Sequence, residues 1–253
     1  MRSYFFHFDF IGRDFERSRR DYFSVFILIN GFFIIFPQID LSVSRYFFRY
    51  GDFFLSHDAF WLALRDMHRS SLCYLLASFI PLIFLYTLWR SPLRVIAPHK
   101  LLYIGLTFVL GPGVLVQGLK VLIGRARPRQ LIEFGGTRDF TPIWQWTAMG
   151  TKNCSFPSGE AAAAAAMLSL LILLPSRLRV PAAIILVPLL MLVSLNRVFM
   201  GAHFLSDVVI AWTLVLGVML WLWPRIVTNG DAIDCWVRDK GAVARAMLYR
   251  KAN

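Results

Sequence analysis

Three short clusters of polar residues in this sequence have the types and spacing to carry chemistry. The first holds Lys120 and Arg127, which are seven residues apart, so two turns of a helix would place both on one face. Two cations on one face at a helix end can clamp a dianion. Pro128 disfavours helix at Arg127 and is expected to end the helix there. Snorkelling of both side chains to lipid headgroups would give the same pattern, so this cluster alone leaves both interpretations open.

The second cluster is a turn formed by Pro157, Ser158 and Gly159, followed by Glu160 and an alanine run. A Pro-Ser-Gly turn that opens a helix offers free backbone N–H groups, a hydroxyl group and the positive end of the helix dipole, which together suit an anion. Alternatively, Ser158 serves only as the N-cap of its own helix. A carboxyl group beside an anion site is unusual unless it holds a proton or interacts only with the helix dipole.

The third cluster contains Arg197, His203 and Asp207. Asp207 follows His203 by four residues, which places both on the same helical face. A carboxylate that orients an imidazole fixes its tautomer and raises its basicity, as an activated nucleophile or base requires. Ionisable groups inside a membrane are costly, so such a pair indicates a functional site. We expect the other histidines to lie at the surface, in tails and loops: His7, His57, His68 and His99.

The composition indicates what must position these clusters. Of the 253 residues, 57% are hydrophobic and only 17% are charged, and the mean hydropathy is +0.58. A soluble domain usually has about a quarter of its residues charged, so these values predict a polytopic membrane protein. Six apolar segments predict an all-α bundle of six transmembrane helices over residues 22–223: Tyr22–Phe36, Ser71–Trp89, Leu101–Leu119, Ala161–Leu174, Val180–Leu195 and Val208–Trp223.

The charge distribution predicts the topology and excludes one class of partner. The net charge of +12 is spread in short clusters between apolar runs rather than on one hydrated face, which argues against binding of nucleic acid. Sixteen Lys and Arg residues fall on the side of the two termini and eleven on the other. The positive-inside rule therefore predicts cytoplasmic tails over 1–21 and 224–253 and extracytoplasmic segments over 37–70 and 120–160. All three clusters would then meet at the extracytoplasmic face of a single domain, 1–253.

In this order, the patterns Lys-x6-Arg-Pro, Pro-Ser-Gly-x and Arg-x5-His-x3-Asp resemble those of the type-2 phosphatidic acid phosphatase superfamily. The resemblance implies an integral membrane lipid phosphatase, a phosphoric monoester hydrolase that needs no metal or other cofactor. His203 would be the nucleophile that forms a phosphohistidine, and Asp207 would orient it. The phosphoryl group would be held by the remaining motif residues: Lys120, Arg127, Ser158, Gly159 and Arg197.

The sequence departs from this family at Glu160, where the family usually has the histidine that acts as general acid for the leaving oxygen. A carboxyl group whose pKa is raised toward neutrality could still protonate a leaving alkoxide. Three nearby cations favour the carboxylate instead. The sequence therefore nominates Glu160 as the third catalytic residue and leaves its protonation open.

The segments 36–41 and 153–160, with Glu160 in the second, look most like bacterial lipid A phosphatases, so lipid A phosphate, with the 4′-phosphate as one candidate, is the expected substrate. Arg125 and Arg129 would suit such a multiply anionic headgroup, although snorkelling to lipid headgroups explains the pair equally well. The alternatives are undecaprenyl pyrophosphate, phosphatidic acid or phosphatidylglycerol phosphate as substrate, or a non-catalytic lipid-binding or transport protein. The expected location is the bacterial inner membrane, with the active site facing the periplasm.

Overall fold

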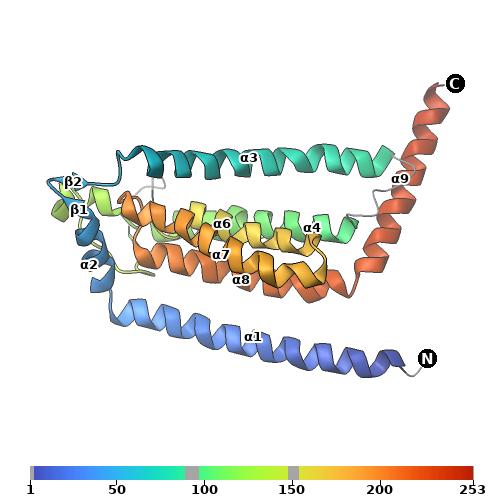
Figure 1. Ribbon diagram of the computed structural model, residues 1–253, viewed down its shortest axis with the longest axis horizontal. Coiled ribbons are helices and arrows are strands. Elements are labelled where there is room, and N and C mark those ends of the chain that lie inside the picture. Colours follow the sequence, from blue (N-terminus) through green and yellow to red (C-terminus); the bar gives the residue numbers. More distant parts are fainter. Residues whose placement is uncertain (1–2, 89–96, 148–153, 253) are drawn as a thin grey trace.

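The computed structural model describes residues 3–88, 97–147 and 154–252, which are helical apart from loops and one short hairpin (Figure 1). The prediction of a helical fold is thus confirmed, and the hairpin pairs Phe48 with Phe53 and Arg49 with Asp52. The elements are α1 (Ser3–Ile35), α2 (Gln38–Phe47), β1 (Phe48–Arg49), β2 (Asp52–Phe53), α3 (Ala59–Leu88), α4 (Pro98–Phe108), the π-helical η1 (Val109–Val116), α5 (Gln117–Ile123), the 3-10 turns η2 (Pro128–Gln130) and η3 (Ile132–Phe134), α6 (Gly159–Met167), the 3-10 segment η4 (Leu168–Leu173), α7 (Ser176–Phe199), α8 (Leu205–Val227) and α9 (Gly230–Ala252).

Among the described residues, three helical segments are long and apolar enough to cross a membrane: Pro98–Gln130, Ser176–Phe199 and Leu205–Ile226. Helices α1 and α2 meet at a bend of 76° and make a fourth if the pair is one span. The apolar helix Gly159–Leu173 is shorter than the roughly 20 residues that a span usually needs. The predicted count of six spans is therefore not confirmed, and Trp89, the end of one predicted span, lies outside the described residues.

Helix α6 lies at the centre of the bundle because its side chains are small. All six alanines from Ala161 to Ala166 are buried, and α6 packs against α7 and α8. Small side chains let neighbouring helix backbones approach closely, as the alanine run predicts. The Pro-Ser-Gly turn at the start of α6 is therefore held inside the protein.

Helix α2, the hairpin and the segment after α5 lie together at one end of the bundle (Figure 1). The two ends of the chain lie at the opposite end (Figure 1). Aromatic rings of Phe53, Phe134 and Phe204 pack together at the first of these ends. Gly201 has a φ of +61°, and a Cβ there would lie 2.3 Å from the Phe53 ring, so both conformation and space require glycine. This contact fixes the loop between α7 and α8, which carries His203.

Candidate active site

A cavity of about 340 Å³ lies at the end of the bundle that carries the hairpin. Segments far apart in the sequence supply its walls, and all three polar clusters contribute. The lining residues are His68, Arg69, Leu72, Pro112, Gln117, Lys120, Arg127, Gly159, Glu160, Ala163, Arg197 and His203. Of the predicted site residues, only Ser158 and Asp207 do not line the cavity, and both are fully buried beside it.

Lys120 and Arg127 reach the cavity in a way the sequence did not predict. Helix α5 ends at Ile123 rather than at Arg127, because Gly124 adopts the left-handed conformation, with a φ of +66°, and caps the helix. Arg127 follows in an extended segment, so the two cations do not share a helical face. The expectation of one face was wrong, although both side chains line the same cavity.

The start of α6 faces Lys120. A Cβ on Gly159 would lie 3.3 Å from the Lys120 Nζ atom, so the ammonium group approaches the helix N-terminus closely. The Ser158 Oγ atom accepts the Ala161 N–H group at 3.3 Å, and Ser158 is therefore the N-cap of α6. The backbone N–H of Ser158 donates to the Asp207 carbonyl at 3.1 Å, which ties this helix start to α8.

His203 lies in the loop before α8, so the expectation that it shares a helical face with Asp207 was wrong. Its Nδ1 atom is nevertheless 3.6 Å from the Asp207 carboxylate. Ser155 was not nominated by the sequence, but its hydroxyl donates to the same carboxylate and lies 3.4 Å from the His203 Nδ1 atom. Nδ1 is thus oriented toward Asp207, which leaves Nε2 as the nitrogen for chemistry. Burial lowers the pKa of His203 to about 4, so the imidazole is neutral at physiological pH, as a nucleophile must be.

Arg125 lies behind this pair and was misassigned from the sequence. Its side chain is 0% exposed, with Nη1 2.7 Å from Asp207 and Nη2 2.8 Å from Asp40. The guanidinium also stacks on the Phe204 ring, 4.1 Å from its centroid. Arg125 is therefore not a headgroup contact, because a buried guanidinium needs carboxylate partners and finds two of them here. Asp40 belongs to α2 and to none of the three polar clusters.

Glu160 is held by two arginines. Its Oε1 atom accepts hydrogen bonds from Arg69, at 2.5 Å from Nη2 and 3.0 Å from Nε. Its Oε2 atom lies 2.9 Å from the Arg197 Nε atom. Arg69 belongs to α3 and was not nominated by the sequence. These two guanidinium groups favour the ionised form of Glu160.

His68 contradicts the expectation that it lies at the surface. It is only 5% exposed, and its Nε2 atom is 3.2 Å from the main-chain oxygen of Glu160. Helix α3 begins at Ala59, so His68 lies within a helix that packs on α6 and α7 rather than in a loop.

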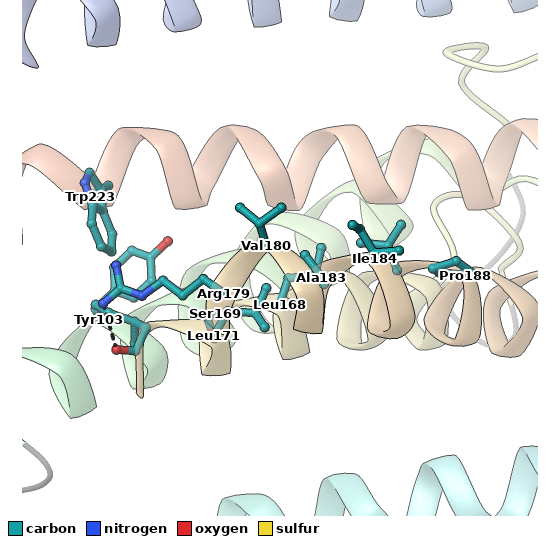
Figure 2. A pocket seen from close by; sticks show the side chains of 12 residues that line it. Tyr103, Leu168, Ser169, Leu171, Arg179, Val180, Ala183, Ile184, Pro188 and Trp223 are labelled. Carbon is teal, nitrogen blue, oxygen red and sulfur yellow. Dashed lines mark hydrogen bonds between the residues drawn. The ribbon is translucent and has the colours of Figure 1, made fainter. Parts of the chain in front are cut away.

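A second cavity, of about 660 Å³, has a different character (Figure 2). Its walls come from α4, η4, α7 and α8 and are almost entirely apolar, with Tyr103 and Trp223 near the Arg179 side chain. Arg179 donates to the main-chain oxygens of Ile172 and Leu174. The lining of this cavity includes no carboxylate and no histidine, and none of the three polar clusters contributes to it. Within the described residues, no group of three His, Cys, Asp or Glu side chains could hold a metal ion.

Replacing Arg125 with methionine is expected to destabilise the protein strongly. The variant leaves the Asp40 and Asp207 carboxylates buried without their shared cation, and breaking a buried pair in this way costs about 3–5 kcal/mol. Thermal unfolding in detergent would measure the loss, with Arg129→Met, at an exposed position, as the matched control. If both variants unfold at the wild-type temperature, the buried network does not stabilise the site.

The chain is similar to known proteins over the region that holds this site. The family model of the PAP2 superfamily matches residues 100–231, which include all three clusters. Lipid A 4′-phosphatases are similar to this chain, with 41% identity over 107 residues for Rhizobium leguminosarum and 38% over 105 for Rhizobium etli. These matches cover 42% and 41% of this chain but only 46% and 41% of the relatives, less than half of their length.

The lipid A 4′-phosphatase of Francisella tularensis subsp. novicida is 28% identical over 183 residues, which are 70% of this chain and 82% of that protein. Among solved structures, the PAP2-type phosphatidylglycerolphosphate phosphatase from Bacillus subtilis is similar at 22% identity and a TM-score of 0.48. That alignment covers 83% of this chain and 96% of the solved one.

Proposed function

Because this chain belongs to the PAP2 superfamily, we propose that it is an integral membrane lipid phosphatase that acts through a phosphohistidine on His203. One observation carries the proposal. A neutral, buried imidazole oriented by Asp207 faces a cavity that is also lined by four cations: Arg69, Lys120, Arg127 and Arg197. An activated nucleophile beside such an anion site suits attack on a phosphoryl group.

In this mechanism the phosphate monoester enters the cavity as a dianion. Lys120, Arg127 and Arg197 neutralise its oxygens, and the backbone N–H groups at the start of α6, beside Ser158 and Gly159, add the positive end of the helix dipole. The Nε2 atom of His203 attacks phosphorus, and Asp207 stabilises the positive charge that develops on the ring. Water then hydrolyses the phosphohistidine. Electrostatic stabilisation comes from side chains, so no metal is required.

We propose lipid A as the substrate and its 4′-phosphate as the group removed. The three relatives reported above are named lipid A 4′-phosphatases. The match to the Francisella protein covers 70% of this chain. The open, cation-lined cavity at the bundle end suits a lipid whose phosphate stays at the membrane surface while its acyl chains lie against apolar helices.

We further propose that the whole chain, 1–253, is one domain with six spans in the bacterial inner membrane, with α3 and α6 as the two spans beyond those counted above. Both chain termini lie at the end opposite the cavity, and that end carries the larger share of Lys and Arg. The positive-inside rule therefore supports cytoplasmic termini and a site that faces the periplasm.

A substrate panel tests this function. Purified protein in detergent should release phosphate fastest from lipid A, and mass spectrometry should locate the loss at the 4′-position. Phosphatidic acid, phosphatidylglycerol phosphate and undecaprenyl pyrophosphate should react more slowly, and EDTA should leave the rate unchanged. Faster release from undecaprenyl pyrophosphate would contradict the substrate assignment, and binding of lipids without phosphate release would contradict the enzyme assignment.

A further inference from the structure

We propose that His68 of α3 is the general acid that protonates the leaving oxygen, supplying from another helix the histidine that position 160 lacks. This inference rests on the proposed phosphatase function. The observation behind it is that the His68 imidazole lies against the backbone of Glu160. The main-chain oxygen of Glu160 is 3.2 Å from the His68 Nε2 atom. A histidine side chain thus occupies the cavity wall beside the first turn of α6.

The position of His68 suits proton transfer. It is 5% exposed, yet it lines the same cavity as the nucleophile His203 and the cations that bind phosphate. In an imidazolium both ring nitrogens carry a proton. Because Nε2 points at the Glu160 carbonyl, the proton on Nδ1 is the one available to a leaving oxygen.

Glu160 itself is engaged elsewhere. Arg69 and Arg197 bind its two carboxylate oxygens, so it serves as their counter-ion and holds no proton to donate. Arg69 directly follows His68 on α3. The same turn of this helix therefore places the imidazole at the cavity and pairs with the Glu160 carboxylate. The Arg69–Glu160 pair is therefore a tether that keeps α3, and His68 with it, against α6.

Charged groups from α3, α6 and α7 lie near the His68 imidazole. Burial disfavours the imidazolium most, and Arg69 on α3 and Arg197 on α7 add to this, whereas Glu160 on α6 favours it. A bound phosphate dianion neutralises these cations and brings negative charge next to the ring. Substrate binding therefore favours the protonated form that the first step needs.

The two half-reactions balance with His68 as the proton carrier. In the first, the His203 Nε2 lone pair forms a bond to phosphorus, the phosphorus–oxygen bond breaks, and the leaving oxygen takes its electron pair and the His68 proton. In the second, water attacks phosphorus, the phosphorus–nitrogen bond breaks, and neutral His68 accepts the water proton. One water is consumed, and both histidines return to their starting state.

The test uses His68→Gln, which keeps an N–H donor for the Glu160 carbonyl but cannot transfer a proton. Phenyl phosphate, lipid phosphate monoesters and p-nitrophenyl phosphate are compared. We expect kcat/KM to fall about 10²–10⁴-fold for the first two, whose leaving oxygens need a proton, and less than about tenfold for p-nitrophenyl phosphate. His57 is an exposed histidine in the loop before α3, so His57→Gln is the matched control and should leave the rates on all three substrates unchanged.

A rescue variant separates chemistry from structure. Adding Glu160→His to His68→Gln restores a histidine at the first turn of α6 and should recover part of the rate on phenyl phosphate. Equal losses on phenyl and p-nitrophenyl phosphate would overturn the proposal by showing a structural role. A selective loss in Glu160→Gln but not in His68→Gln would assign the acid to Glu160 instead. If wild-type protein releases no phosphate from lipid A, the lipid A assignment fails, while the phenyl and p-nitrophenyl phosphate comparison still decides the role of His68.

Discussion

Replacement of His203 by alanine is expected to reduce phosphate release by about four to six orders of magnitude, because the enzyme loses the atom that forms the bond to phosphorus. The imidazole is buried against Asp207 and Ser155, and no other histidine among the described residues that line the cavity is oriented by a carboxylate in this way. Steady-state phosphate release from lipid A in detergent measures the effect.

Two controls make the His203 result specific. The His57→Ala variant removes an exposed histidine and should retain full activity. Thermal unfolding of His203→Ala should show that the protein remains folded, since the phosphate-binding cations and α6 are unchanged. A folded His203→Ala protein that still turns over lipid A would contradict nucleophilic catalysis by this residue.

Asp207→Asn is expected to lower kcat by about 10⁴-fold, the order lost when the carboxylate that orients a catalytic histidine becomes an amide. The amide would no longer favour the tautomer of His203 that carries its proton on Nδ1. In the other tautomer Nε2 carries the proton and has no lone pair with which to attack phosphorus. The substitution would also leave Arg125 with one carboxylate rather than two.

Asp58→Asn provides a matched control for Asp207→Asn. Each of these aspartates accepts a backbone N–H at the start of a helix, Phe204 in one case and Phe60 in the other, but Asp58 is exposed and far from the cavity lining. Asp58→Asn should leave kcat unchanged. If kcat of Asp207→Asn falls only in proportion to the fraction of folded protein, Asp207 stabilises the fold and does not act by orienting His203.

The local part of this site was predictable from the sequence. The helix-opening turn at Ser158 is a short-range pattern that the structure confirms. His203 and Asp207 are close, as their spacing suggested, although His203 precedes α8 rather than lying on it. The alanine run likewise indicated close packing of α6. Such features depend on residues a few positions apart, where backbone geometry determines which side chains are neighbours.

The long-range part was not predictable. Arg125 lies 85 residues from Asp40 in the sequence, and Arg69 lies 91 residues from Glu160, so only the packing of α2 and α3 reveals these pairs. The left-handed Gly124 also ends α5 before Arg127, and the seven-residue spacing of Lys120 and Arg127 does not reveal this. His68 was misplaced for the same reason, because its burial depends on where α3 lies.

The most direct test of the central claim is to trap the covalent intermediate. Wild-type protein mixed with radiolabelled lipid A and quenched within milliseconds should carry an acid-labile, alkali-stable phosphoryl group, and mass spectrometry should locate it on His203. The label should disappear on a chase with unlabelled substrate at the rate of turnover. Turnover with no phosphorylated protein, or with the phosphoryl group on a residue other than His203, would contradict the mechanism.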